Sequence, residues 1–359
     1  MSRDELSGVE LESDARAAAE GPAEPAPVVF IMGAGVVGTA LAARLVRAGV
    51  PVAGLHGRQR DAPGDPSDAA GGSSGVLASA GEIPAILSES DVVIISVRDD
   101  RIPEVAARLV REQRLRPHQV VLHTSGAISA GQALVAARPQ VRAVGTLHPL
   151  VSFAGARFAV EELTSVVFGI EGDQPAQAVA ARLVRALGAR AVFLDAESLP
   201  LYHVGAVLAS NYVVALADLA RGLLVKAGVP ADQALPALIP LLASVVQNLS
   251  RVGLPDALTG PVERGDVSTV EQHLRILEAR APEMLDLYRL VGRDVLRLAQ
   301  EKSALEPAAV TRLDALLRAP GGASGTSGGR VSEAMKEPTQ EAMKATDKDA
   351  GRGGAKKKR

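Results

Sequence analysis

A glycine pattern near the N-terminus constrains the fold of this chain more than any other feature. Gly33, Gly35 and Gly38 follow the spacing GxGxxG, directly after the apolar run PVVFIMGAG and at the start of the helix-like run VVGTALAARLVRAGV. In such a strand–turn–helix unit, the first glycine permits a tight turn, the second lets a pyrophosphate approach, and the third lets the helix pack closely. Free N–H groups at the helix start favour negative charge there. The predicted dinucleotide contacts are Gly33, Ala34, Gly35, Val36, Val37 and Gly38.

Dinucleotide binding has one alternative, a glycine-rich turn in an α/β protein that takes another ligand. The end of the second predicted strand, residues 55–60, indicates which dinucleotide binds, because NAD enzymes place an acidic residue there for the ribose hydroxyls. This segment has no acid but carries Arg58 and Arg60, whose guanidinium groups suit a 2′-phosphate. The pattern therefore favours NADP(H) over NAD(H), although Asp61 lies nearby and both arginines fit a solvated loop as well.

Strand-like and helix-like runs alternate after the glycine motif. This alternation is typical of a doubly wound, mainly parallel sheet, and we predict an α/β Rossmann domain over residues 27–197. A helix is expected at residues 174–188. The expected strands after the first are residues 51–58, 90–98, 118–127, 141–150, 164–172 and 189–197.

The pattern becomes all-helical near Ser198 and stays so to about residue 318. A long apolar helix is predicted over residues 202–227, and because it is apolar on more than one face, its own domain or a second subunit must bury it. Ser268 and Glu271 have the spacing of a capping box for a later helix. We predict an all-helical substrate and dimerisation domain over residues 198–318.

Composition excludes several classes of function. The chain has no cysteine and a net charge of -2, which excludes thiolate chemistry and gives no global sign of nucleic-acid binding. No spacing suggests a metal site, and the longest apolar runs are interrupted by polar residues or proline, so neither a metal nor a membrane partner is expected. Residues 1–26 and 319–359 read as a disordered leader and tail, the latter ending in KKKR, and a cytoplasmic protein is predicted.

Polar residues follow the predicted strands at the edge where ligands of open α/β sheets bind. His148 ends an apolar strand, as does His123, and for each the alternatives are a catalytic role and a structural hydrogen bond. The other residues expected to face the cofactor at this edge are Ser96, Val97, Arg98, Thr124 and Ser125.

The helical region adds three candidate residues. His203 and Asn211 are eight positions apart and would share one face of a continuous helix. Arg264 lies in the polar loop LTGPVERGDVS and could clamp a carboxylate. The alternatives are an asparagine satisfied by a neighbouring helix, and an arginine paired with Glu263 or Asp266 to shape the turn.

The motifs GAGVVGTALA, SVRDD, HTSGA, GTLHPLVSF, YHVGAVLASNY and LTGPVERGDVSTVEQHL resemble a family of candidate NADP-dependent oxidoreductases. Its members join a Rossmann-like domain to a C-terminal helical domain of unknown function, similar to that of 6-phosphogluconate dehydrogenase. More distantly, the chain is similar to ketopantoate reductase, pyrroline-5-carboxylate reductase and the β-hydroxyacid dehydrogenases. The resemblance implies reductase chemistry and a homodimer formed through the helical domain. Two departures are Val207, where β-hydroxyacid dehydrogenases carry a catalytic lysine, and Arg98, where similar members have proline.

These observations predict an NADP(H)-dependent oxidoreductase that reduces a C=O or C=N group of a small metabolite by hydride transfer in a cleft between the domains. His203 is the expected proton donor, with His148 as the alternative, since histidine suits this role near neutral pH. Asn211 would orient the substrate and Arg264 would bind its carboxylate. Two alternatives stay open: a non-catalytic NADP(H)-sensing protein, and an enzyme that uses a deazaflavin such as F420 as the hydride donor.

Overall fold

The computed structural model describes residues 25–57, 78–153, 163 and 166–318. The chain forms two compact units, Met1–Ala217 and Asp218–Arg359. This division comes later than the change of sequence pattern at residue 198, because Leu199 is buried and Tyr202 packs against a strand of the sheet. The predicted tail and nearly all of the predicted leader lie outside the described residues.

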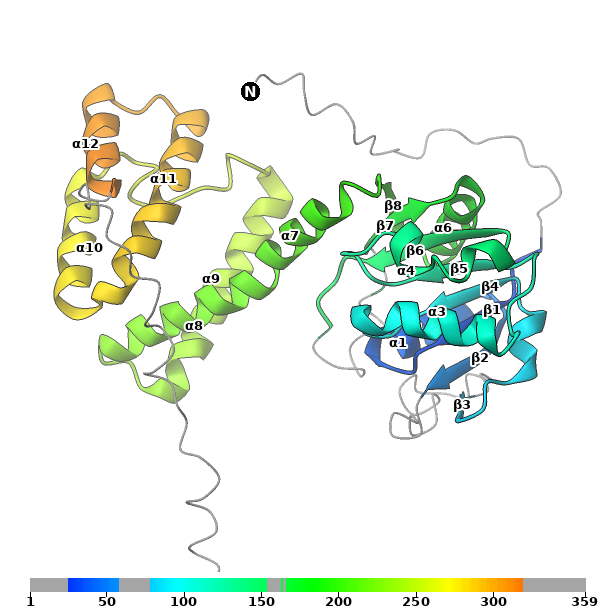
Figure 1. The fold of residues 1–359 in the computed structure, drawn as a ribbon. Coiled ribbons are helices and arrows are strands. Elements are labelled where there is room, and N and C mark those ends of the chain that lie inside the picture. Colours follow the sequence, from blue (N-terminus) through cyan, green and yellow to red (C-terminus); the bar gives the residue numbers. More distant parts are fainter. Residues whose placement is uncertain (1–24, 58–77, 154–162, 164–165, 319–359) are drawn as a thin grey trace, which may run out of the picture. The chain divides into compact units, whose positions relative to one another are not determined.

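The first unit is built on an eight-stranded sheet with the order β3-β2-β1-β4-β5-β6-β7-β8 (Figure 1). All neighbours pair in parallel except β6 and β7, which pair antiparallel with His148 opposite Gly169. The first six strands have the order of a Rossmann sheet, which confirms the predicted fold class. The strands are β1 (Val29–Met32), β2 (Val52–Gly57), β3 (Ala78–Ala80), β4 (Val92–Ile95), β5 (Val120–His123), β6 (Ala143–Pro149), β7 (Val167–Gly172) and β8 (Arg190–Phe193).

Helices cover both faces of this sheet, which explains why its strands are continuously apolar. On β1, Val29 and Ile31 enter one core with helices α1 (Val36–Arg47) and α6 (Gln174–Ala186). Phe30 and Met32 enter the other core. That second core also takes the buried side chains of α3 (Ile102–Arg111) and α4 (Ala130–Ala133).

The first long helix of the helical region differs from the prediction. The expected helix over residues 202–227 is two helices, α7 (Leu199–Ala209) and α8 (Asn211–Lys226), because Ser210 leaves helical geometry with φ -120° and ψ -77°. The Ser210 hydroxyl donates to the Ala206 carbonyl at 2.7 Å, a back-bond that tends to bend helices. The remaining helices are α9 (Ala231–Val252), α10 (Val267–Arg280), α11 (Leu285–Lys302) and α12 (Pro307–Leu317).

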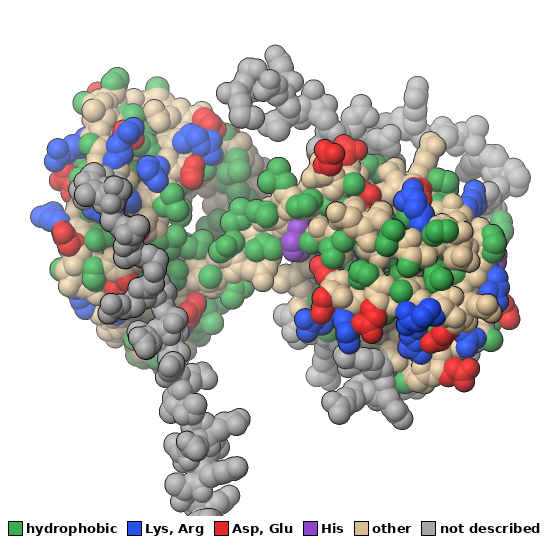
Figure 2. All heavy atoms as spheres, in the orientation of Figure 1, with side chains coloured by type: hydrophobic (Ala, Val, Ile, Leu, Met, Phe, Trp, Pro, Cys, Tyr) green, Lys and Arg blue, Asp and Glu red, His purple; other side chains and the backbone are tan. Residues whose placement is uncertain are grey.

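Apolar side chains are exposed along α7, α8 and α9. In α8 no residue is buried, and in α7 and α9 only Leu199 and Ala234 are. By length and composition alone, residues Leu199–Lys226 and Ala231–Val252 are apolar enough to cross a membrane, a property that the sequence analysis had discounted. Figure 2 shows hydrophobic side chains gathered along the stretch of α7 and α8. By contrast, α10, α11 and α12 pack on a core of their own that includes Val270, Leu296 and Leu313.

Candidate functional site

The glycine loop connects β1 to α1 at the carboxyl edge of the sheet, and each glycine has a distinct reason to be there. Gly33 adopts φ +126°, and a Cβ on it would lie 2.0 Å from the Ser96 carbonyl oxygen. A Cβ on Gly38 would lie 1.9 Å from the Gly33 oxygen. Gly35 is different, because nothing lies within 4 Å of its Cβ position. The first and third glycines are therefore required by packing, and the second leaves open space in front of the backbone.

The start of α1 supplies the donors that an anion needs. Thr39 donates the first hydrogen bond of the helix, to the Gly35 carbonyl at 2.9 Å, so the N–H groups of Val36, Val37 and Gly38 have no partner inside the helix. The first turn has no acidic residue to oppose a bound anion. Together with the open space at Gly35, these groups fit the pyrophosphate of a dinucleotide.

The carboxyl end of β2 lies beside this loop. His56 on this strand is buried, and its Nδ1 lies 2.9 Å from the Ser79 hydroxyl on β3. Burial lowers the pKa of His56, and Arg108 lowers it further. A Cβ on Gly57 would lie 2.6 Å from that of Ala34, which brings β2 against the loop. Arg58, on which the NADP(H) prediction depends, lies outside the described residues.

The residues predicted after β4 and β5 reach the same edge in different ways. Ser96 is buried and 3.5 Å from the Thr124 hydroxyl, so these two side chains meet across neighbouring strands. Ser125 is also buried, and its hydroxyl accepts from the Ala127 N–H at 3.1 Å, which shapes the turn. Arg98 is exposed and bonds Asp100 at 3.1 Å. Val97 is half-buried against the second core, which contains Phe30 and Met32.

His123 is fully buried at the end of β5. Its Nδ1 accepts from the Ser125 N–H at 3.2 Å, and burial lowers its pKa to about 4, with a smaller opposing contribution from the Ser129 backbone. Of the two roles that the sequence allowed, this environment favours the structural one, because the ring is enclosed and neutral at physiological pH.

His148 is the centre of a cluster at the carboxyl end of β6. Its Nδ1 lies 3.2 Å from the Tyr202 hydroxyl, and its ring centroid lies 5.6 Å from that of Tyr202 and 6.0 Å from that of His203, edge-on to both. A Cβ on Gly126 would lie 2.7 Å from the ring. Two of the predicted residues, His148 and His203, are thus brought together, with Tyr202 as a third member.

The electrostatics of this cluster favour a neutral His148. Burial lowers its pKa to about 4, proximity to His203 lowers it as well, and Asp99 acts in the opposite direction. Burial raises the pKa of Tyr202 to about 12, with the Gly169 backbone amide opposing. Burial and the neighbouring imidazole thus both favour the uncharged form of His148. His203 has its Nδ1 buried without a hydrogen-bond partner among the described residues.

The family model of a Rossmann-like domain matches residues 17–149, and that of DUF2520, a domain of unknown function, matches residues 166–295. The chain joins a Rossmann-like domain to a DUF2520 domain. This confirms the resemblance that the motifs indicated. The DUF2520 match begins one residue before β7. His148 belongs to the first matched region and Tyr202 and His203 to the second, so their contacts link the two regions within one compact unit.

Similar solved structures cover most of the chain. One is a protein from Thermotoga maritima, at 24% identity and TM-score 0.59 over 76% of this chain and 99% of that one. Another is a candidate NADP oxidoreductase from Bacteroides fragilis, at 23% identity and TM-score 0.56, over 76% of this chain and 98% of that one. A third is an NADH-preferring ketol-acid reductoisomerase from an uncultured archaeon, at 18% identity and TM-score 0.51, over 80% of this chain and 82% of that one. At these identities the likeness establishes the fold. No curated protein matches the chain.

The other predicted residues of the DUF2520 domain are exposed. Asn211 begins α8 beyond the break at Ser210, whose hydroxyl lies 3.0 Å from its side chain, so the expected shared helix face with His203 is interrupted. Arg264 forms no ion pair within the described ranges, and the expected partner Glu263 pairs with Lys302 at 3.1 Å. The N-cap of α10 is Asp266, which accepts from the Thr269 N–H at 3.0 Å.

Asp266 thus replaces the predicted cap at Ser268. Its pKa falls to about 2, chiefly because the Thr269 side chain and backbone donate to it and Ser268 adds a third bond. Glu271, the expected partner in a capping box, pairs instead with Arg312 at 2.8 Å. Arg264 makes only the smallest contribution to this lowering of the Asp266 pKa, and its side chain is exposed.

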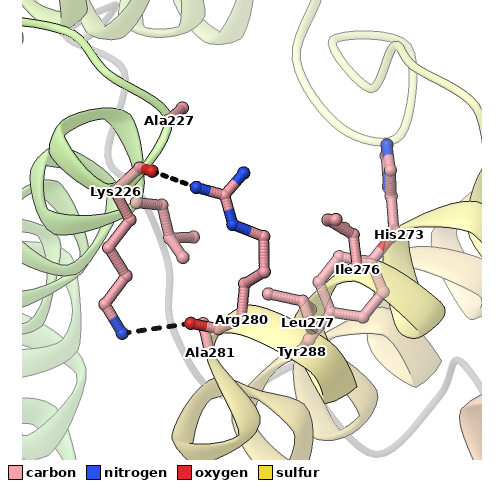
Figure 3. Close-up of a pocket in the computed structure, with 9 residues that line it drawn as sticks. Lys226, Ala227, His273, Ile276, Leu277, Arg280, Ala281 and Tyr288 are labelled. Carbon is pink, nitrogen blue, oxygen red and sulfur yellow. Dashed lines mark hydrogen bonds between the residues drawn. The ribbon is translucent and has the colours of Figure 1, made fainter.

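A cavity of about 320 Å³ lies inside the helical unit, between the end of α8 and helices α10 and α11 (Figure 3). Its wall is mostly apolar, and both cations at it are engaged: Arg280 donates to the Lys226 carbonyl at 2.5 Å, and Lys226 bonds Glu283 at 2.6 Å. No residue predicted from the sequence to act in catalysis lines it. We therefore place the candidate site at the sheet edge, where the glycine loop and the histidine cluster are.

Tyr202, Gly126 and Gly169 are members of this site that the sequence analysis did not select. Gly169 stands inside an apolar strand, VVFGIEG, and glycine in a strand interior often marks a close approach. Here a Cβ would lie 2.9 Å from the Tyr202 hydroxyl oxygen. That signal could have indicated an aromatic neighbour, but the identity of the neighbour required the fold.

Proposed function

We propose that the protein is an NADP(H)-dependent oxidoreductase that reduces a C=O or C=N group of a small metabolite. The observation that carries this proposal is the neutral His148 held beside Tyr202 and His203, at the same sheet edge as a glycine loop that fits a pyrophosphate. Ligands of open α/β sheets bind at this edge, where neighbouring strand orders diverge. The likeness to a candidate NADP oxidoreductase supports the same reaction class.

The residues divide the work as follows. Val36, Val37 and Gly38 hold the pyrophosphate, and bound NADPH supplies a hydride to the substrate carbon. His148 donates a hydrogen bond to the substrate oxygen or nitrogen as a neutral imidazole, as a residue with a lowered pKa can do at pH 7. His203, whose ring stands edge-on to that of His148, delivers the proton, which ultimately comes from water.

Cofactor choice follows from the sequence of the β2 end. Arg58 and Arg60 suit the 2′-phosphate of NADP(H), whereas one similar structure is of an NADH-preferring enzyme. A titration of NADPH and of NADH with purified protein tests this directly, and the absence of tryptophan keeps the nicotinamide fluorescence free of background. Tight NADPH binding that Arg58→Ala weakens about 10-fold or more supports the proposal. Equal binding of NADH contradicts the NADP(H) assignment.

Turnover is tested by NADPH consumption with a panel of keto acids and cyclic imines. If Arg264 clamps a carboxylate, Arg264→Ala raises KM for the keto acids and leaves it unchanged for uncharged imines. A deazaflavin donor is tested in the same panel by its own absorbance change. Tight NADPH binding without turnover on any substrate favours the alternative, a non-catalytic NADP(H)-sensing protein, for which Val207 at the lysine position of related dehydrogenases is the motivating observation.

We further propose that a second copy of the chain covers α7, α8 and α9. Large apolar side chains such as Leu201, Val214 and Val246 are more than half exposed on these helices, and burying each one contributes about 1.5–3 kcal/mol. Obligate homodimer interfaces are apolar in this way, as a core divided between two subunits. Asp218 and Arg221, paired on α8, favour a protein partner over a lipid core.

Light scattering after gel filtration tests the dimer. Val214→Glu places a charge in the proposed interface and is expected to yield monomers or unfolded chain. Val135→Glu is the matched control, because Val135 is similarly exposed, at 64% against 71%, but lies beside α4 on the sheet unit. A wild-type monomer contradicts the proposal, and binding to lipid vesicles by the wild type indicates a membrane partner instead.

A further inference from the structure

The His148 ring is held in a slot that fixes its orientation. Gly126 closes one side, since even a Cβ there would lie 2.7 Å from the imidazole. Tyr202 and His203 stand edge-on, with interplanar angles of 84° and 74°. A ring that cannot turn presents one nitrogen to Tyr202 and the other away from it, so which nitrogen carries the proton decides what the site offers a ligand.

The hydrogen bond between Tyr202 and His148 has a preferred direction. The phenol is the more acidic group, and the imidazole nitrogen is the better acceptor. The Gly169 backbone lies close to the Tyr202 hydroxyl and lowers its pKa, in opposition to burial. If Nδ1 donated to the phenol oxygen, the hydroxyl proton would have no acceptor among the described residues. The hydroxyl therefore donates to Nδ1 across 3.2 Å.

We propose that Tyr202 is a positioning residue that fixes His148 as the tautomer protonated on Nε2. The Nε2–H is then the donor available to a substrate oxygen or nitrogen at every pH at which the ring is neutral. This inference rests on the proposed function for its catalytic consequence, but the tautomer itself is a property of the unliganded protein. A histidine with the proton on Nδ1 would offer the substrate a lone pair and could not stabilise a developing negative charge.

Tyr202 and His203 are adjacent residues of α7, yet they act on His148 in different ways. Tyr202 bonds Nδ1, whereas His203 contributes charge repulsion that lowers the His148 pKa. Asp99 opposes that repulsion from the loop after β4. Loss of the Tyr202 hydroxyl therefore removes the bond that stabilises the neutral ring and leaves the surrounding charges in place.

The test is Tyr202→Phe, which deletes the hydroxyl and keeps the ring packing. Nitrogen NMR of 15N-histidine-labelled protein reports the protonation of each ring nitrogen, and the His148 signals are assigned by their loss in His148→Asn. The wild type is expected to show a bare Nδ1 and a protonated Nε2. In Tyr202→Phe, the signals shift towards a mixture of tautomers and the His148 pKa rises. A His148 tautomer unchanged in Tyr202→Phe overturns the proposal.

The chain contains a matched control in its other unit. His273 and Tyr288 form a similar pair, with Nδ1 2.8 Å from the hydroxyl and the rings at 88°. Tyr288→Phe is expected to change the His273 signals and to leave those of His148 and the turnover rate unchanged. Should Tyr202→Phe unfold, Gly169→Ala displaces the same hydroxyl by a contact of 2.9 Å and gives a second variant for the same NMR readout.

Kinetics separate this inference from the proposed function. With a substrate found by the NADPH screen, Tyr202→Phe is expected to lower kcat about 10-fold, the effect of one hydrogen bond, with little change in NADPH affinity. A changed tautomer with unchanged kcat overturns the catalytic role. A changed tautomer in a protein without any turnover leaves the positioning established and refutes the proposed reductase function instead.

Discussion

Replacing Gly35 by alanine separates cofactor binding from folding in a way that no other residue of the loop allows. Gly35 adopts φ -77° and ψ -175°, which suit alanine, and no heavy atom of the described residues beyond its immediate neighbours lies within 4 Å of its Cβ position. Alanine at an N-cap costs some stability relative to glycine, but it also restricts the unfolded chain. The two effects partly cancel, so the free energy of unfolding is expected to change by no more than about 1 kcal/mol.

The effect on NADPH binding should be larger. A methyl group at position 35 occupies the space through which the pyrophosphate approaches the N–H groups of Val36 and Val37. Loss of one hydrogen bond to a charged group costs about 1.5–3 kcal/mol, which corresponds to an increase of about 10-fold to 150-fold in Kd. Titration of nicotinamide fluorescence measures the Kd, and urea unfolding measures stability on the same samples.

Gly38→Ala is the contrasting variant. Its Cβ would lie 1.9 Å from the Gly33 oxygen, a backbone atom, so the helix must shift, and overpacking of this kind costs about 1–3 kcal/mol. The expected outcome is a less stable protein. If Gly35→Ala folds normally and still binds NADPH as tightly as the wild type, the assignment of the loop as the pyrophosphate site is refuted.

Two further predictions concern the histidines. His123 and His148 have folded-state pKa values of about 4, below the ordinary 6.5, so the unfolded chain binds protons that the folded chain refuses as the pH falls from 6.5 to 4. The free energy of unfolding should therefore decrease as the pH is lowered through this window, by up to about 3 kcal/mol for each group. His123→Asn should make the pH dependence measured by urea unfolding less steep. The control His118→Asn, which changes an exposed ring, should leave that dependence as it is. His203→Ala should lower kcat about 10²–10⁴-fold if His203 delivers the proton, whereas His273→Ala should not; unchanged turnover in the former removes that role.

The sheet was predictable because its strands are buried on both faces and read as continuous apolar runs. Seven of the eight strands coincide with runs identified in the sequence, and only the three-residue β3 was missed, since Ala78–Ala80 has no apolar signal. The antiparallel pairing of β6 with β7 was equally invisible, because strand direction depends on the path of the intervening chain. Local composition therefore indicates which segments are buried strands, but it does not indicate which strands pair with one another or in which direction.

The candidate site was only partly predictable for the same reason. His148 stood out as a polar residue at the end of an apolar strand, and the rule for ligand sites in α/β sheets selected it. Tyr202 did not, because its importance comes from a partner 54 positions earlier. The break at Ser210 was missed because the sequence on both sides has helical composition, and the hydroxyl that bends the chain is a single side chain.

The pairing of β6 with β7 has a consequence for how this protein can be divided. The Rossmann-like match ends at residue 149 and the DUF2520 match begins at residue 166, yet β6 and β7 on either side of this boundary are neighbours in one sheet. A chain cut between them would leave β6 as an unprotected edge, prone to pair with other molecules, and would remove Tyr202 from His148. The two matched regions are therefore not interchangeable modules. A chimera that takes one region from another protein would also need a matching β6–β7 pairing and a tyrosine at the position of Tyr202.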